Sequence, residues 1–376
     1  MKKLVCVFLL MFLLGVSVTA GAVEEFNVSE VELNAKAFGM GGAYTGVADD
    51  ISSIIYNPAG ISQSGALGAY GNIGFMVPNL NKIKKLSGLP EYLNDFTAES
   101  ASDILDTIPE DMSLKSQFFF GGNIKSLGAG LNIYDNVATN KSGDTASMSN
   151  RITSEGMVSF GKNLTSPFLN IGALSYGVNL KMLKSKNNSY HLVDTSSPTP
   201  ELTSISTKGS GFGMDAGLLL KLTDVIQVGM GIENIIASEY TMKGEEKTST
   251  YDVGTEEWST VTDSDYTGAT IKHSPKVRAG ASLKLPVINA TLAADVDNVF
   301  LWDDSEEMTT HLGLEKDLLF NGFSIRAGTF SKADSAPMYT LGLGLNLLTM
   351  HVDAAVGFDE SLQQTQTFIL SGNMKF

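Results

Sequence analysis

The sequence predicts an all-β fold: a transmembrane antiparallel β-barrel of about 14 strands that encloses a short N-terminal segment. Three observations predict it. Alternating residue types recur through most of the chain after residue 63, the connections between these segments are alternately long and short, and a glycine-rich stretch precedes the first of them. The chain therefore divides into a signal peptide (1–22), an N-terminal segment (23–63) and a barrel (64–376).

The N-terminus has the three parts of a secretory signal peptide. Lys2 and Lys3 form a basic region, residues 4–18 are apolar, and Ala20 and Ala22 form an A-x-A cleavage site. The alternative is a retained membrane anchor, but the apolar run is short. Later stretches are not apolar over enough residues for a spanning helix, so we expect the chain to cross a membrane as a barrel.

Composition limits the possible functions. Cys6, the one cysteine, lies in the signal peptide, so the mature chain is expected to have no disulfide and no thiol chemistry. The 26 basic and 41 acidic residues give a formal charge of −15, and removing Lys2 and Lys3 gives 24 − 41 = −17. Such an acidic chain is not expected to bind nucleic acid.

Alternation is clearest at the C-terminus, where one face of the last segment is apolar and the other is polar. The apolar face consists of Phe368, Leu370, Gly372, Met374 and Phe376. Fourteen such segments are predicted near 64–77, 113–122, 126–138, 150–162, 169–184, 207–222, 224–236, 271–285, 287–299, 308–316, 320–330, 337–346, 349–358 and 363–376.

Connection lengths favour a barrel over a sandwich. The long connections are 78–112, 139–149, 185–206, 237–270, 300–307, 331–336 and 359–362, and they alternate with short turns such as 123–125. A membrane barrel has tight turns on one rim and longer loops on the other, whereas a soluble sandwich has no reason to sort its loops in this way. The even strand count predicts that both termini lie on the short-turn, periplasmic side.

The polar faces of four predicted strands carry charge. Basic and acidic side chains on neighbouring strands predict a ladder of lumen charges: Lys276, Arg278, Lys284, Asp295, Asp297, Glu315 and Arg326. A charged side chain facing lipid is costly, about 2–4 kcal/mol for a basic residue at the midplane, so these faces are expected to point inward. The alternative is a set of solvated surface pairs, each contributing little.

The stretch 37–60, AFGMGGAYTGVADDISSIIYNPAG, is rich in small residues that allow close backbone packing. Apolar residues at helical spacing predict a short helix over 47–55, and Asn57 before Pro58 predicts its end. Asp49 and Asp50 are expected to meet Lys276 and Arg278. An ordinary glycine-rich N-terminal loop is the alternative interpretation.

Two separated blocks of this stretch, GMGGAYTGVADD and YNPAG, follow a signal peptide. In this it resembles the FadL-like superfamily of outer-membrane transporters for long-chain fatty acids and toluene, and the chain length is nearer its PorV-like branch. The resemblance implies that the segment is a hatch that plugs a barrel lumen. The hatch residues that it assigns are Gly39, Met40, Gly41, Gly42, Asp49, Asp50, Asn57, Pro58, Ala59 and Gly60.

The resemblance implies two functions. The first is passive uptake of small hydrophobic compounds, of the fatty acid or aromatic hydrocarbon class, across the outer membrane of a diderm bacterium. The alternative is a PorV-like binding or assembly protein with a secretion partner. Expected partners are outer-membrane lipid, a hydrophobic ligand and the assembly machinery, which would read the terminal Phe376.

Catalytic and metal motifs have little support. The four histidines follow no metal-binding spacing, and a G-x-S-x-G nucleophile elbow does not occur. The acidic run 303–307 could supply oxygen ligands to Ca²⁺, although such runs are more often solvated loops. The connection 78–112 has the pattern of two short helices, which would cap the barrel or capture a ligand. We expect neither enzymatic activity nor a cofactor or metal.

Overall fold

The computed structural model describes residues 34–78, 112–143, 145–164, 173–193, 199–252, 255, 257–299, 308–332, 337–358 and 365–376. The signal peptide, most of the connection 78–112 and the acidic run 303–307 lie outside these residues. The helices are α2 (Ala35–Gly39), α3 (Ser53–Tyr56) and the 3-10 helix η2 (Pro58–Gln63). Among the described residues, the helices are too short or too polar to cross a membrane.

The strands are β1 (Leu67–Pro78), β2 (Met112–Ile124), β3 (Leu127–Ser142), β4 (Thr145–Leu164), β5 (Leu174–Val193), β6 (Glu201–Lys221), β7 (Ile226–Ile236), β8 (Glu239–Asp252), β9 (Glu257–Lys272), β10 (Lys276–Leu285), β11 (Ala290–Asp297), β12 (Thr309–Leu318), β13 (Phe323–Lys332), β14 (Met338–Leu347), β15 (Met350–Phe358) and β16 (Thr365–Lys375).

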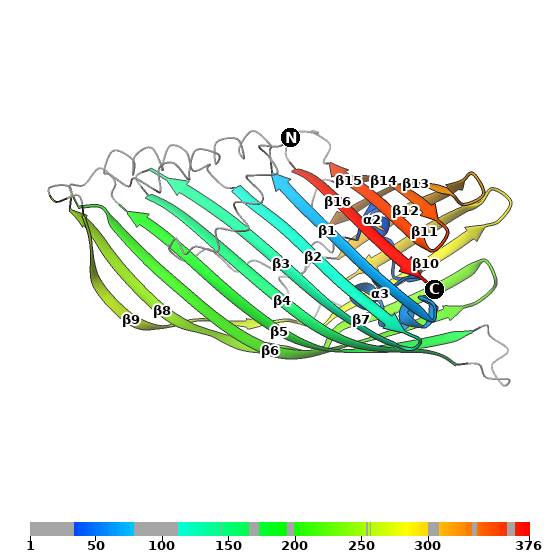
Figure 1. Cartoon of the computed structure of the whole chain (residues 1–376), viewed down its shortest axis with the longest axis horizontal. Coiled ribbons are helices and arrows are strands. Elements are labelled where there is room, and N and C mark those ends of the chain that lie inside the picture. Colours follow the sequence, from blue (N-terminus) through cyan, green and yellow to red (C-terminus); the bar gives the residue numbers. More distant parts are fainter. Residues whose placement is uncertain are drawn as a thin grey trace.

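Fourteen of these strands close into an antiparallel barrel (Figure 1), which confirms the predicted fold. Strands β1 to β7 pair in sequence order, β7 pairs with β10, and β10 to β16 continue the order. Strand β16 closes the ring on β1, from Gly68 opposite Lys375 to Pro78 opposite Thr365. Closure leaves the ring without a free edge.

Strands β8 and β9 extend the wall on one side, where the sequence suggested only a long connection, 237–270. Strand β8 follows β7 in the same direction and pairs with the outer part of β6, while β9 returns beside β8 into β10. Strand β9 lacks a clear apolar face because side chains on both of its faces are exposed, whereas β8 buries Tyr240, Met242 and Tyr251 and is otherwise mostly polar. The wall is therefore tall at β4, β5 and β6, with 20, 20 and 21 residues, and short at β11 and β15, with 8 and 9.

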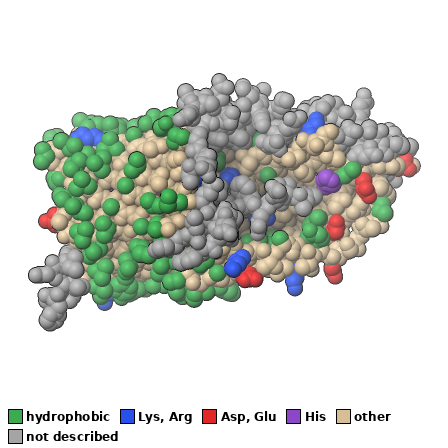
Figure 2. All heavy atoms as spheres, turned by 180° about the vertical axis from the view of Figure 1, so that it is seen from behind, with side chains coloured by type: hydrophobic (Ala, Val, Ile, Leu, Met, Phe, Trp, Pro, Cys, Tyr) green, Lys and Arg blue, Asp and Glu red, His purple; other side chains and the backbone are tan. Residues whose placement is uncertain are grey.

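Side chains alternate between the lumen and the outside. In β14, Thr340 is buried, whereas its neighbours Tyr339 and Leu341 are 40% and 50% exposed. Exposed leucines lie at matching positions on adjacent strands, such as Leu292 of β11 opposite Leu314 of β12. Figure 2 shows hydrophobic side chains gathered over the half of the barrel that carries the short turns. A lipid bilayer requires this arrangement of a barrel, with an apolar exterior around a polar interior.

Short turns join the strands at the end of the barrel where the C-terminus lies (Figure 1). They connect β2 to β3, β6 to β7, β10 to β11, β12 to β13 and β14 to β15. We call this end the short-turn rim. Phe376 lies there, and its backbone N–H donates to Leu67 O at 2.7 Å.

Candidate functional site

Residues 34–63, which we call the hatch segment, lie inside the ring of strands. Helix α2 packs against β13 to β16, and η2 packs against β4, β5 and β6 on the opposite wall. Ala37, Met40 and Tyr44 are fully buried and form a cluster with Leu219 of β6 and Ala293 of β11. The segment therefore crosses the lumen from one wall to the other.

Local hydrogen bonds give the hatch segment its irregular shape. The Asn34 side chain caps α2 by accepting from the backbone N–H groups of Lys36 at 2.8 Å and Ala37 at 3.2 Å. The helix predicted over 47–55 covers only Ser53–Tyr56, because the backbone of Ala48 is left-handed, with φ 27°. The spacing of apolar residues therefore predicted a longer helix than the one that forms.

Asn57 joins the hatch segment to the wall. Its backbone is extended (φ −156°), as expected before Pro58, and its Oδ1 accepts from Ala59 N at 3.2 Å. Its Nδ2 donates to Thr45 O at 3.1 Å and to Leu218 O of β6 at 3.0 Å. One fully buried amide therefore fixes the turn, a distant part of the hatch segment and a barrel strand at once.

Inward-facing glycines of the wall make room for the hatch backbone. A methyl group added at any of them would come within 3.0 Å of hatch atoms. At Gly177 and Gly217 it would meet the Asn57-Pro58 turn, and at Gly313 and Gly328 it would meet Met40 and its neighbour. We call the set the glycine belt: Gly68, Gly177, Gly217, Gly229, Gly231, Gly313, Gly328 and Gly357. The sequence analysis missed it, although glycines at alternate positions within predicted strands were a visible signal.

Replacing Gly328 by valine is expected to unseat the hatch segment without unfolding the barrel. The added side chain would overlap the backbone of Gly41, which cannot turn away as a flexible side chain would. We expect increased permeability to small sugars in liposome swelling, with heat-modifiable gel mobility retained. Gly156→Val is the matched control, because a methyl group there meets nothing within 4 Å. Liposomes that are equally impermeable to sugars with either variant would contradict the role of Gly328 in seating the hatch segment.

Part of the predicted charge ladder forms on β7, β10 and β11. Arg278 lies 3.3 Å from a carboxylate oxygen of Glu233 and 3.6 Å from one of Asp297, and Lys276 lies 3.5 Å from Asp297. Lys181 of β5 extends the network to Glu233 at 3.5 Å. Lys284 shares the lumen face but is exposed beside the short turn, away from these pairs.

Asp295 contacts the hatch segment rather than a basic residue of the ladder. Its Oδ2 accepts from the backbone N–H groups of Tyr44 at 2.7 Å and Thr45 at 2.5 Å. Gly280, opposite it on β10, leaves room for the carboxylate. His311 Nδ1 lies 2.7 Å from Gly41 O, so a second wall side chain holds the hatch backbone.

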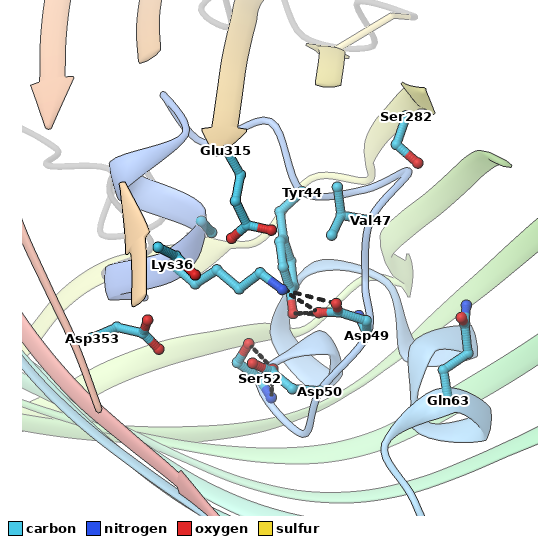
Figure 3. A network of polar contacts seen from close by, with 12 residues as sticks. Lys36, Tyr44, Val47, Asp49, Asp50, Ser52, Gln63, Ser282, Glu315 and Asp353 are labelled. Carbon is cyan, nitrogen blue, oxygen red and sulfur yellow. Dashed lines mark hydrogen bonds and ion pairs between the residues drawn. The ribbon is translucent and has the colours of Figure 1, made fainter. Parts of the chain in front are cut away.

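The expected contact of Asp49 and Asp50 with Lys276 and Arg278 is wrong. The Asp49 carboxylate instead lies 2.8 and 2.9 Å from Lys36 Nζ (Figure 3). Asp50 Oδ1 accepts from the backbone N–H of Ser52 at 2.8 Å, and Figure 3 shows the two side by side. The wall cations already have carboxylate partners, whereas Lys36 lies within the hatch segment beside Asp49.

Burial and charge act in opposite directions on the two hatch carboxyls. Burial would raise the pKa of Asp49, but the Lys36 ammonium outweighs it and holds that pKa below its ordinary value. For Asp50, burial and the neighbouring Asp49 charge together raise the pKa. The hatch segment therefore carries one strongly ionised carboxylate that belongs to an internal ion pair.

A third group of charges surrounds Arg326 of β13. Its Nε lies 2.6 Å from Glu315 of β12, as the ladder predicted, and its Nη1 lies 2.7 Å from Asp353 of β15. All three side chains are at most 12% exposed. Figure 3 places Glu315 and Asp353 on the lumen side, near Lys36 of α2. These charges therefore lie directly against the hatch segment.

The side chains of the site hold the hatch segment in the lumen through hydrogen bonds. Backbone N–H and C=O groups of the hatch segment meet carboxylate, imidazole and amide groups of the wall. Within the described ranges, histidine and acidic side chains form no group of three that could hold a metal ion. Residues that the sequence analysis did not single out here are Lys36, Lys181, Asp215, Glu233, His311 and Asp353.

Known proteins resemble the chain in structure and not in sequence. Neither a protein-family model nor a curated protein matches it. The P. putida toluene transporter TodX superposes with a TM-score of 0.61 at 12% identity, over 90% of this chain and 97% of that one. The monoaromatic hydrocarbon channel CymD gives 0.62 at 14%, over 94% and 99%.

A Pseudomonas aeruginosa FadL homologue gives a TM-score of 0.62 at 12% identity, over 92% of this chain and 98% of that one. The superpositions span nearly the whole of each known protein, so they include the complete barrel. The chain therefore has the FadL-like fold.

Proposed function

We propose that the protein is an outer-membrane channel of the FadL-like type, through which small hydrophobic compounds diffuse passively. The observation that carries the proposal is the hatch segment seated across a closed barrel of 14 strands. A segment packed across the lumen takes the place of a wide aqueous pore, so the barrel suits compounds that need no such pore. Fatty acids and aromatic hydrocarbons are the classes concerned.

An apolar cluster on the inner face of the tall wall supports this substrate class. Leu183 of β5 and Tyr240 and Met242 of β8 are buried together, with Ile271 of β9 packed against them. They lie beyond the hatch segment, toward the ends of β5 and β6 farther from the short-turn rim. A hydrophobic compound entering from that side would meet this surface before the hatch.

Uptake by cells tests the proposal. A diderm host carrying the protein in its outer membrane is given radiolabelled toluene or oleate, and the initial rate is compared with that of the empty host. Thr153→Trp is expected to lower the rate, because Thr153 is 3% exposed and lies beside Ser185, whose hydroxyl meets that of Tyr240 at 2.7 Å. The large ring would fill the lumen next to the apolar cluster.

Val158→Trp is the matched control on the same strand, because Val158 faces outward and is 60% exposed. Surface levels and heat-modifiable mobility of both variants are checked first. Uptake no faster than in the empty host, for both compounds, would contradict the channel. A protein that instead purified with a stable secretion partner would match the PorV-like alternative.

A further inference from the structure

Three neighbouring turns of the short-turn rim present bare apolar side chains. Val287 lies at the tip between β10 and β11 and is 98% exposed. Phe320 lies between β12 and β13, and Leu348 between β14 and β15, and both are fully exposed. These connections are neighbours around the ring, because β10 to β15 pair in order.

The other described turns of this rim have polar tips. Lys125 and Ser126 join β2 to β3, and Thr223 and Asp224 lie between β6 and β7. The residues at the very tips are therefore divided into apolar ones, between β10 and β15, and polar ones, which exposed Ile124, Leu127 and Leu222 flank. Hydrophobic residues needed only to make turns would not be sorted in this way.

The backbone conformation of the apolar tips indicates that their side chains serve a purpose other than forming the turn. Leu319, Phe320 and Leu348 have φ values of 51°, 56° and 54°, in the left-handed region. Asn and Gly are the usual residues of such turns, and a bulky residue there costs roughly 1–2 kcal/mol. Polar alternatives would form the turns more easily and would also avoid exposing apolar surface to water.

The apolar tips continue the lipid-facing surface, which is interrupted on β12 by Lys316. Leu345 and Leu347 of β14 are exposed on the outside, Leu348 follows at the tip, and Met350 begins the outward face of β15. On β12 the exposed Leu314 and Leu318 lead in the same way to the next tip. The surface therefore extends over the rim instead of ending below it.

Strand length gives an independent reason for lipid at the tips. A membrane-crossing strand needs about 9–11 residues, and β11 and β15 have only 8 and 9. Strand β11 is thus shorter than this length and β15 only just reaches it, so apolar turns would add the length that the shortest strand lacks. The long strands on the opposite side have no such need.

We propose that the tips at Val287, Leu319, Phe320 and Leu348 are inserted into the lipid leaflet at the short-turn rim, while the tips at Lys125 and Thr223 lie in water. The occupant of this surface is lipid, and the barrel is anchored on its short side by its turns. The inference rests on the membrane barrel and not on which compound passes through it. In the proposed function this leaflet is the periplasmic one.

Tryptophan fluorescence in vesicles tests the insertion. Both native tryptophans, Trp258 and Trp302, are replaced by Phe, and Phe320→Trp, Leu348→Trp or Thr223→Trp is then added singly. Each protein is reconstituted alone into phosphatidylcholine vesicles with or without brominated acyl chains. We expect blue-shifted emission and strong bromine quenching at 320 and 348, and water-like, unquenched emission at 223.

Water-like, unquenched emission at both 320 and 348 would overturn the proposal and point instead to a periplasmic protein as the occupant of the tips. Equal quenching at 223 would also overturn it, since the rim would then be uniformly inserted. Heat-modifiable mobility confirms that each protein compared is folded. Because the two apolar tips lie on separate hairpins, failure of one variant to fold leaves the other to decide.

Discussion

Removal of residues 37–60 will leave a folded barrel that leaks small polar solutes. The ring is closed by strand-to-strand pairing, and the hatch segment contributes no strand to it. Without the segment, the glycine belt and the carboxylate of Asp295 would face an open, hydrated lumen. We expect liposomes containing this variant to swell rapidly in small sugars, while liposomes containing the full-length protein stay tight.

Deletion of residues 254 and 255 is the control, because it shortens the connection between β8 and β9 and leaves two residues for the turn. Both variants should shift in gel mobility on heating, as folded barrels do. A hatch deletion that folds, with liposomes as tight as those of the full-length protein, would mean that the segment is not a plug. The proposed channel would then lose its main support, whereas the inserted tips would be unaffected.

The barrel was predictable because its signal is local. Alternation along each strand and the lengths of the connections are properties of short windows, so all 14 ring strands are found. The same reasoning misses β8 and β9, since β9 is exposed on both faces and β8 is mostly polar, so neither has a continuous apolar face to detect. Strand β8 pairs with β6 and β9 pairs with β8, and pairing between residues far apart in the sequence is not visible in a short window.

The contacts of the hatch were much less predictable. Asp295 and Asp297 lie on one face of β11, two residues apart, yet one binds the hatch backbone and the other binds Arg278. Which of the two carboxylates contacts the hatch segment depends on how far along the barrel axis the segment lies. Lys36, the partner of Asp49, precedes the stretch that carries the resemblance, and its role depends on how that stretch folds back on itself.

The pairing of Arg326 of β13 with Glu315 of the neighbouring β12 was predicted, and its second pairing, with Asp353 of β15 beyond β14, was not. Together the two pairs lead to a large expected effect on stability. Replacing Arg326 by methionine is expected to destabilise the barrel by about 3–5 kcal/mol, because Glu315 and Asp353 would remain buried without their cation. The measurement is equilibrium unfolding by urea in lipid vesicles, followed by gel mobility.

Lys284→Met is the matched control, since it removes a cation from the same lumen face at an exposed position, and we expect a change within about 0.5 kcal/mol. The triple variant R326M/E315Q/D353N should recover part of the loss, because it removes the unpaired charges together with their partner. If R326M unfolds like the unaltered protein, the two acids do not depend on the guanidinium, and the lumen must be wet enough to solvate them. Under that outcome the hatch could not be held by a dry charge network, and its seat would rest on the glycine belt and on Asn57.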